Sequence, residues 1–324
     1  MEVATASQPV RQPSFHGSGG TLFGIQLVNM LLTMITLGIY YFWGKTKVRA
    51  YVHSQTEFEG DRFAYHGTGK ELLIGWLKAI GIFLVLIGGS AALGYFGPKS
   101  LPIAILIYPL VYAFMLMLIP VAIVGSRKYR LSRTSWRGVR FSFRGATWEF
   151  VKFFVGGSLL TAITLGLYSL FFSNNMWRYL VSHSYFGSQR FEFDGRGSDL
   201  FGRFIRAILL SIVSLGIYWV WFVAERQRYY WAHTSIAGAR FRSTVQGGPL
   251  FRLYLGDVLL LIITLGLALP WVRVRNIRFI CSNLALDGQV DLEAIRQEAQ
   301  VAPATGDELA DFLGIDYPGL VPGP

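Results

Sequence analysis

The sequence is short of charged residues. Asp, Glu, Lys and Arg make up 15% of its 324 residues, whereas soluble domains average about 25%. Apolar residues make up 52%, so few charges remain to cover the surface of a folded chain. This shortage argues against an ordinary soluble protein and directs attention to the long apolar segments.

Cysteine and catalytic motifs are equally scarce. The one cysteine, Cys281, excludes an internal disulfide and a metal site built from several cysteines. The sequence contains no Gly-x-Ser-x-Gly motif, no phosphate-binding loop and no His-Glu-x-x-His motif. His53, His183 and His233 follow three apolar segments at similar distances, which favours shared packing over a metal site. We therefore predict that the chain is not an enzyme and uses no metal and no cofactor.

The charges that are present are mostly positive, because 30 Lys and Arg face 19 Asp and Glu and leave a net charge of +11. An excess of this kind suits either nucleic acid or an anionic membrane surface. Since apolar runs separate the basic clusters, we predict anionic membrane lipids as partners and no nucleic acid. The polar N-terminus lacks the layout of a cleaved signal peptide, so the first apolar segment is expected to serve as the membrane signal.

Long apolar segments dominate the rest of the chain. At about 1.5 Å of rise per residue, roughly 23 residues of helix exceed a hydrocarbon core of about 30 Å. Trp, Tyr and Arg crowd the segment ends, as they do at membrane interfaces. We predict an all-α membrane protein with about six transmembrane or membrane-embedded helices, rather than a large soluble protein with buried helices. The six segments are 21–43, 71–96, 101–124, 149–172, 200–223 and 250–272.

One phrase occurs four times near the ends of these segments. It reads TLGIYYFW from Thr36, TLGLYSLF from Thr164, SLGIYWVW from Ser214 and TLGLALPW from Thr264. The glycines of the phrase are Gly38, Gly166, Gly216 and Gly266. Each glycine is followed five residues later by an aromatic residue: Trp43, Phe171, Trp221 and Trp271. Each is followed eleven or twelve residues later by an arginine: Arg49, Arg178, Arg228 and Arg278. We expect the aromatic rings at the membrane–water boundary and the arginines on lipid headgroups.

A second phrase follows each basic helix end. It reads GDRFAYHG from Gly60, GVRFSFRG from Gly138 and GSQRFEFDG from Gly187, with a looser copy from Gly238. Alternating side chains beside a glycine turn predict short β-hairpins between the helices. Units of about 50 residues with a fixed order indicate a repeat architecture. We place this membrane domain at 13–290, after a polar tail at 1–12 and before an acidic, partly disordered tail at 291–324.

Taken together, the Thr-Leu-Gly phrase, the basic helix end and the Gly-x-Arg-Phe-x-Phe-x-Gly phrase resemble the YjgN family of bacterial inner-membrane proteins. The resemblance covers roughly residues 13 to 290. The chain departs from it at Ala268, where the other copies have Tyr. The resemblance implies a multi-pass protein of the bacterial inner (cytoplasmic) membrane and implies no activity.

Two topologies are consistent with the sequence. If all six segments cross the membrane, the distribution of Lys and Arg favours both termini outside, but hairpins of similar sequence would then face opposite sides. In the alternative, each Thr-Leu-Gly phrase is the turn of a re-entrant hairpin and returns the chain to the cytoplasmic side. We take six full crossings as the prediction and the re-entrant hairpins as the alternative.

Polar residues inside the apolar segments are the last functional signal. Asp257 and Asn29 each lie nine residues before a glycine of the Thr-Leu-Gly phrase, and intramembrane carboxylates often mark functional sites. The structural alternative is that both side chains lie near a helix end and bond to neighbouring main-chain groups or to Arg252. For Asp257, further possible partners on adjacent helices are Arg203, Arg206 and Asn29. We predict a non-enzymatic membrane scaffold or lipid-interacting protein. The alternative function is a transporter or channel that uses Asp257 and Asn29.

Overall fold

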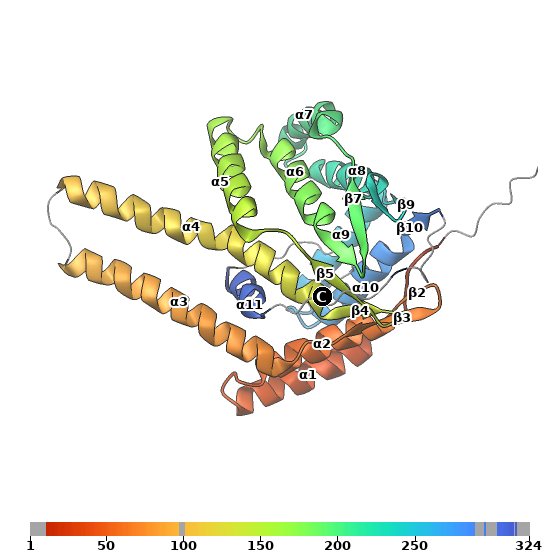
Figure 1. The fold of residues 1–324 in the computed structure, drawn as a ribbon. Coiled ribbons are helices and arrows are strands. Elements are labelled where there is room, and N and C mark those ends of the chain that lie inside the picture. Colours follow the sequence, from red (N-terminus) through yellow and green to blue (C-terminus); the bar gives the residue numbers. More distant parts are fainter. Residues whose placement is uncertain (1–10, 97–100, 289–294, 296–302, 314, 316–324) are drawn as a thin grey trace, which may run out of the picture.

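The computed structural model describes residues 11–96, 101–288, 295, 303–313 and 315 (Figure 1). These residues form long helices and one antiparallel sheet, so the prediction of an all-α protein is wrong. The helices are α1 Gly19–Ile35, α2 Tyr41–Gln55, α3 Gly69–Phe96, α4 Leu101–Ser132, α5 Thr147–Ile163, α6 Ser169–Ser182, α7 Gly197–Val213, α8 Trp219–Ala232, α9 Gly247–Ile263, α10 Leu269–Ser282 and α11 Thr305–Phe312.

Each strand pairs with the strand that follows it in the sequence. The strands are β1 Ser14–Phe15, β2 Thr56–Phe58, β3 Asp61–Tyr65, β4 Thr134–Trp136, β5 Val139–Phe143, β6 Ser184–Phe186, β7 Gln189–Phe193, β8 Thr234–Ile236, β9 Ala239–Ser243 and β10 Leu284–Asp287. The strands expected as separate hairpins therefore join into a single sheet. The order β-hairpin, helix, helix recurs along the chain, as in β6–β7–α7–α8 and β8–β9–α9–α10.

The two ends of the sheet meet. The Leu286 N–H donates to the Arg11 carbonyl at 2.8 Å, and these residues form an antiparallel bridge. Residues 11–15 therefore lie between β10 and β2, and α10 packs against α1. The units thus form a closed ring.

Register places one apolar residue from most strands in a common core. The cross-strand partners are Phe63 and Trp136, Phe141 and Phe186, Phe191 and Ile236, and Phe241 and Leu286. All of these side chains belong to or pack against one hydrophobic cluster. Alternation in the Arg-Phe-x-Phe phrase is explained by this arrangement, because successive side chains of a strand point to opposite faces.

The Thr-Leu-Gly phrase is a turn between two helices, and the prediction of six crossings is wrong. Segment 21–43 contains α1, a turn at 36–40 and the start of α2. Leu37 and Gly38 both have positive φ, 50° and 96°, and the Gly38 N–H donates to the Thr33 carbonyl at 2.8 Å. This bond is the Schellman ending of a helix. Segments 149–172, 200–223 and 250–272 are broken in the same way.

The hydroxyl residue that opens the phrase ends the first helix and binds the main chain just before the second helix. The Thr36 hydroxyl accepts from the Tyr40 N–H at 2.9 Å, and Thr164, Ser214 and Thr264 make the same bond four residues onward at 3.0 Å. The departure at Ala268 leaves the turn intact, since the bond uses the main-chain N–H of that residue. The local geometry of the re-entrant alternative is therefore what the structure shows.

The pair α3–α4 is longer than the other helical hairpins and extends furthest from the sheet (Figure 1). Its helices have 28 and 32 residues, about 42 and 48 Å of helix, whereas α1, α5, α7 and α9 have 17 residues each. Within the described residues, one stretch, Gly69–Ala92 of α3, is long and apolar enough to cross a membrane, by length and composition.

Aromatic residues after the turns join neighbouring units. A Cβ added to Gly247, the first residue of α9, would lie 2.3 Å from Trp221 Cδ1 of the preceding unit. Gly197 meets Phe171, Gly69 meets Trp43, and Gly19 meets Trp271 in the same way. Each aromatic side chain thus packs directly on the main chain of a glycine, at the first residue of the next helical hairpin. The pairing of Trp271 with Gly19 closes the ring of units.

We therefore expect Gly247→Ala to destabilise the protein by about 1–3 kcal/mol, because the added methyl group overpacks the contact with Trp221. Gly248→Ala is the matched control, since a Cβ at Gly248 meets nothing within 4 Å. Thermal unfolding in detergent measures both changes. Equal unfolding temperatures for the two variants would show that the joint between Trp221 and Gly247 is not needed.

Candidate functional site

The turns of the four short hairpins form an exposed apolar surface. Leu37, Leu165, Leu215 and Leu265 are 92–95% exposed and have φ values of 48–52°. A left-handed conformation costs a residue with a side chain roughly 1–2 kcal/mol. Each leucine is therefore both strained and bare of protein contacts. We call these turns and the exposed apolar residues beside them the hairpin tips.

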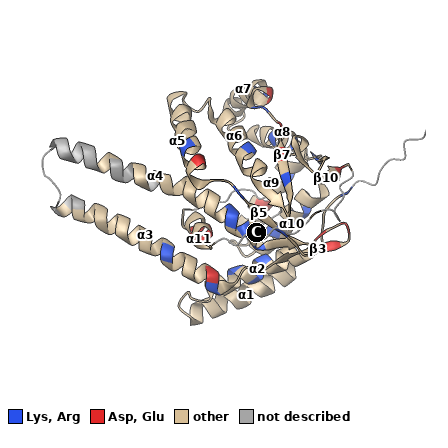
Figure 2. Ribbon diagram, viewed as in Figure 1, with Lys and Arg blue, Asp and Glu red and all other residues tan. Residues whose placement is uncertain are grey.

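The outer ends of the first helices of the hairpins carry no charged residue, beyond Lys78 in α3, Lys152 in α5, Arg206 in α7 and Asp257 in α9. Figure 2 shows the outer part of α5, and the part of α3 beyond its lysine, free of Lys, Arg, Asp and Glu. Exposed basic residues lie closer to the helix starts and form a collar below the tips. The collar consists of Lys78, Lys152, Arg203, Arg206 and Arg252. This order, apolar tip and then basic collar, is that of a membrane interface.

Three of the predicted headgroup arginines hold the chain to the next unit. Arg178, Arg228 and Arg278 donate to the carbonyls of Gly195, Val245 and Gly17, at 2.6, 2.5 and 2.6 Å. Each carbonyl lies two residues before the first residue of a helix. Arg178 and Arg278 are still exposed, so their contact with lipid headgroups stays a prediction.

Arg49 has a different place. It follows its glycine by eleven residues, whereas the other three follow by twelve. One residue corresponds to about 100° around a helix, so Arg49 points in a different direction from the other three arginines. Its side chain is buried, whereas the other three bind the segments before the next helices. Its Nη1 lies 2.7 Å from Asp307 Oδ2 of α11.

Asp257 and Asn29 occupy the contact between the two helices of their own hairpins. Asp257 is buried and accepts from Asn276 Nδ2 at 2.7 Å, with Arg275 Nη1 at 3.5 Å. The partners proposed for Asp257 were wrong, because the structure takes both from α10, whereas the main-chain partner proposed for Asn29 is confirmed. Asn29 Nδ2 donates to the Gly44 carbonyl at 3.1 Å. The geometry is that of helix packing.

Replacement of Asp257 tests this assignment. We expect Asp257→Asn to change the free energy of unfolding by less than about 1 kcal/mol, because the amide oxygen still accepts from Asn276. Asp257→Leu removes one of the two acceptors of the Asn276 amide, the other being the Val272 carbonyl. A hydrogen bond to a charged group contributes about 1.5–3 kcal/mol, so we expect a loss of that size. Thermal unfolding in detergent measures both, with Val258→Leu as the control at an exposed neighbour. Equal losses in the Asn and Leu variants would instead assign the stabilisation to the ion pair with Arg275.

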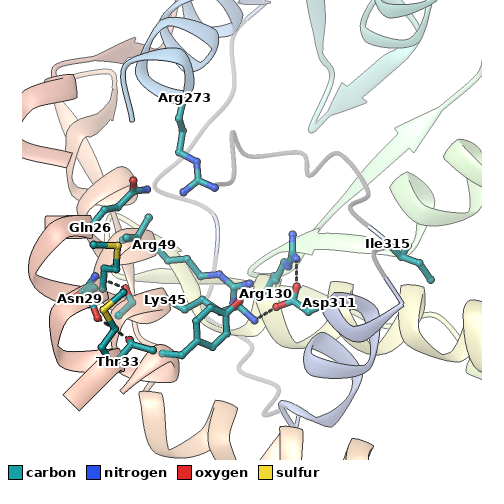
Figure 3. A pocket seen from close by; sticks show the side chains of 14 residues that line it. Gln26, Asn29, Thr33, Lys45, Arg49, Arg130, Arg273, Asp311 and Ile315 are labelled. Carbon is teal, nitrogen blue, oxygen red and sulfur yellow. Dashed lines mark hydrogen bonds and ion pairs between the residues drawn. The ribbon is translucent and has the colours of Figure 1, made fainter. Parts of the chain in front are cut away.

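A cavity of about 740 Å³ lies beside α1 and α2 (Figure 3). Its walls come from α1, α2, α4 and α10, and from Asp311 and Ile315 at the C-terminal end of the described chain. The basic residues in its wall are Lys45, Arg49, Arg130 and Arg273. Sequence reasoning missed this cavity, because its walls come from residues far apart in the chain.

Helix α11 sets three carboxylates against this basic wall. Asp307 is fully buried, and its Oδ1 lies 2.7 Å from Arg130 Nε and 2.9 Å from Ser126 Oγ. Lys45 Nζ lies 2.8 Å from Glu308 Oε1 and also contacts Asp311. Residues 305–312 thus form a packed helix within the predicted tail at 291–324. Most of the rest of that tail, and residues 1–10, lie outside the described residues.

The buried charges shift one another's pKa. Burial alone would raise the pKa of the Asp307 carboxyl, but the charges of Arg49, Arg130 and Lys45 lower it well below its ordinary value. Burial raises the pKa of Glu308, against the opposing effect of Lys45. Burial and Arg49 would lower the pKa of Lys45, but the three carboxylates of α11 raise it. Asp307 and Lys45 are therefore both charged at neutral pH.

Comparison with known proteins gives a family and three named relatives. The family described as bacterial proteins of unknown function, DUF898, matches residues 11–219, 189–241 and 212–312. A protein named Inner membrane protein YjgN from Escherichia coli O157:H7 is 36% identical over 157 residues, which are 47% of this chain and 36% of that protein. The proteins of the same name from Salmonella typhimurium (strain LT2) and Escherichia coli (strain K12) are each 35% identical, over 40% and 47% of this chain and 30% and 36% of their own lengths.

The chain thus spans about a third of the length of the curated relatives it matches. No solved structure matches it.

Proposed function

We propose that this chain, which belongs to the DUF898 family of bacterial proteins, is a lipid-interacting scaffold of the inner membrane. The hairpin tips enter one leaflet of the bilayer, and the basic collar contacts anionic headgroups. The names of the relatives from Escherichia coli and Salmonella typhimurium support the location. The tips and the collar support the mode of attachment.

The single observation that carries the proposal is the set of four leucines at the hairpin tips. In water, each would be strained at positive φ and would expose nearly its whole side chain. Burial of a leucine side chain in an apolar phase contributes about 1.5–3 kcal/mol, which offsets the strain of about 1–2 kcal/mol. Insertion into a membrane explains why an exposed leucine adopts a strained, left-handed conformation at four equivalent turns.

The extent of the apolar surface fits one leaflet. On α1 the exposed apolar residues run from Leu27 to the tip at Leu37, and on α9 from Leu255 to Leu265. Ten residues measure about 15 Å along a helix, which is half of a hydrocarbon core of about 30 Å. We propose that the four tips of the closed ring enter the same leaflet.

Helix α3 reaches deeper than the short hairpins. It starts at Gly69, which is equivalent to Gly19 of α1, and continues for eleven residues more than α1 does. Its exposed apolar residues continue past Ile82 to Ile87 and Tyr95. We propose that α3 crosses the bilayer and that α4 leads the chain back, since β3 before α3 pairs with β4 after α4, while the short hairpins return within one leaflet. All β-hairpins of the ring then lie in the same environment, as their similar sequences require.

The transport alternative has no comparable support. Asp257 is bonded to Asn276 within its hairpin, and it is absent from the wall of the described cavity. Asn29 does line that cavity, but its amide donates to Gly44. The two residues therefore do not face one another across a shared path.

Depth of the tips in a bilayer tests the proposal. In a Cys281→Ser background, a bimane label is placed on Leu215→Cys or on Ala237→Cys, and the protein is reconstituted in vesicles of phosphatidylethanolamine and phosphatidylglycerol. Ala237 is the matched control, since it is also exposed with positive φ but lies in a β-turn of the ring. We expect doxyl lipids to quench the label at Leu215 and aqueous iodide to quench the label at Ala237. Iodide quenching of equal strength at both positions would exclude insertion of the tips.

A further inference from the structure

The cavity beside α1 and α2 has a basic part and an apolar part. Its wall follows α1 from Gln26 to Met34, about 12 Å of helix. Lys45, Arg49 and Arg130 lie on the side that faces α11 (Figure 3). Met30, Met34 and Tyr41 line the part next to the hairpin tip, and Met34 and Tyr41 are largely exposed there. One end is therefore cationic, and the other is apolar and opens beside a tip.

Lys45 and Arg273 occupy equivalent positions in their units. Each follows the glycine of its turn by seven residues, Gly38 and Gly266 respectively. The two positions come together because α10 packs against α1 where the ring closes. Arg273 approaches the cavity from the side opposite α11 (Figure 3). Basic side chains thus line the cavity on both of its sides.

Helix α11 fills the cationic end with carboxylates although it is no part of the ring. The ring closes through Arg11 and Leu286, before α11 begins. The helix lies against α3 and α4, where Gly306 meets Gly125 and Ala304 meets Gly75 at backbone distance. Phe312 packs against Phe83 with ring centroids 4.2 Å apart and the rings tilted by 32°. Undocking of α11 from α3 and α4 would therefore leave the ring of units closed.

We propose that this cavity binds one anionic phospholipid and that α11 competes with it. The phosphate takes the place of the α11 carboxylates on Lys45, Arg49 and Arg130, and an acyl chain lies along Met30 and Met34. A guanidinium binds a phosphate as readily as a carboxylate, so the acidic face of α11 mimics the headgroup. The inference rests on the proposed function in one respect: the apolar end must lie at a tip that reaches the leaflet.

Affinity for a short-chain lipid tests the competition. Full-length protein in detergent is titrated with dioctanoyl phosphatidylglycerol by calorimetry, as wild type and as the variant Asp307→Asn/Glu308→Gln/Asp311→Asn. If α11 leaves the site open in roughly a tenth of the molecules or fewer, its release tightens the apparent affinity at least about tenfold. The matched control neutralises three exposed acids of the sheet, Asp61, Asp194 and Asp287, and should leave the affinity unchanged. No tightening in a folded variant would overturn the proposal.

A reversible lock keeps the test valid if that variant fails to fold. Phe83→Cys/Phe312→Cys in the Cys281→Ser background allows α11 to be fixed in its seat by a disulfide or a short cleavable cross-link. We expect the locked protein to bind no dioctanoyl phosphatidylglycerol and the released protein to bind as the unmodified chain does. Because one protein serves for both states, folding differences are excluded. Equal binding in both states would overturn the competition.

Two further ligands and two variants identify what is bound. Inorganic phosphate should bind at least about tenfold more weakly than dioctanoyl phosphatidylglycerol, because it lacks the acyl chains. Dioctanoyl phosphatidylcholine tests the need for a net negative charge and should also bind weakly. Lys45→Gln/Arg273→Gln should lose affinity, whereas Arg190→Gln, at an exposed position of β7 outside the cavity, should keep it. Equal affinity for inorganic phosphate would overturn the assignment to a lipid.

Failure of this inference and failure of the proposed function are distinguishable. The label at Leu215 reports the depth of a tip in α7–α8, far from the cavity in α1–α2. A quenched tip without lipid binding in the cavity would remove only the inference. A tip open to iodide would remove the proposed function itself.

Discussion

Replacing Asp307 by alanine is expected to release α11 from its seat. The side chain is fully buried between Arg49 and Arg130, and its pKa lies well below the ordinary value, so it is a carboxylate at every pH near neutrality. Removal of one partner of a buried ion pair costs about 3–5 kcal/mol, because the remaining charge stays desolvated. Undocking of α11 hydrates both arginines, so we expect local release rather than global unfolding.

Amide hydrogen exchange of residues 303–313 measures this release. A loss of about 3–5 kcal/mol corresponds to exchange that is roughly a hundredfold to a few thousandfold faster. Asp311→Ala is the matched control on the same helix, since Asp311 is partly exposed and its ion pairs with Lys45 and Arg130 lie at the rim. Its expected effect is at most about 1 kcal/mol. Unchanged protection of α11 in the Asp307 variant would show that its apolar contacts with α3 and α4 suffice.

Changing Leu37, Leu165, Leu215 and Leu265 together to asparagine should have opposite effects on folding and on membrane insertion. Asparagine tolerates the left-handed conformation better than leucine does, so we expect the free energy of unfolding in detergent to rise by up to about 1 kcal/mol per site. In a bilayer, four leucine side chains contribute roughly 6–12 kcal/mol on transfer to the apolar phase. The variant loses this contribution and gains four polar groups.

A bimane label at Ile217→Cys, which is half-exposed beside the α7–α8 turn, reports the outcome in vesicles. We expect the label to be shielded from iodide in the parent protein and open to iodide in the asparagine variant. Ala237→Asn relieves the same kind of strain in a β-turn and should leave the label shielded. If the asparagine variant were more stable in detergent and its label were still shielded in vesicles, the leucines would not be needed for insertion.

The turns were within reach of sequence reasoning, and the sheet was not. The phrase from Thr36 contains a helix-ending glycine and a hydroxyl that accepts four residues onward, which together define a turn. Segment length alone favoured a crossing, because 23 residues suffice to span a bilayer. Closure of the sheet depends on the pairing of Arg11 with Leu286. No local signal marks a pair of residues at opposite ends of a chain.

The arginines show how one residue of spacing decides a role. Arg178, Arg228 and Arg278 share a spacing of twelve and share one structural contact. The spacing of eleven at Arg49 was visible in the sequence and, at 100° per residue, pointed to another helix face. The partner on that face was not visible, since Asp307 is 258 positions away. Acidic residues at 307, 308 and 311 share a helix face, yet acidic composition alone indicated a tail.

The closed ring also fixes an order of events during synthesis. Strand β10, Leu284–Asp287, is synthesised after the four β-hairpins β2–β3, β4–β5, β6–β7 and β8–β9 and after helices α1 to α10. Until β10 leaves the ribosome, the segment Arg11–Phe15 has β2 on one side and an unpaired strand edge on the other. A free edge readily pairs with another chain. Among the described residues, the segment Arg11–Phe15, which includes β1, is thus exposed to mispairing until β10 is made, and its pairing with β10 ends that exposure.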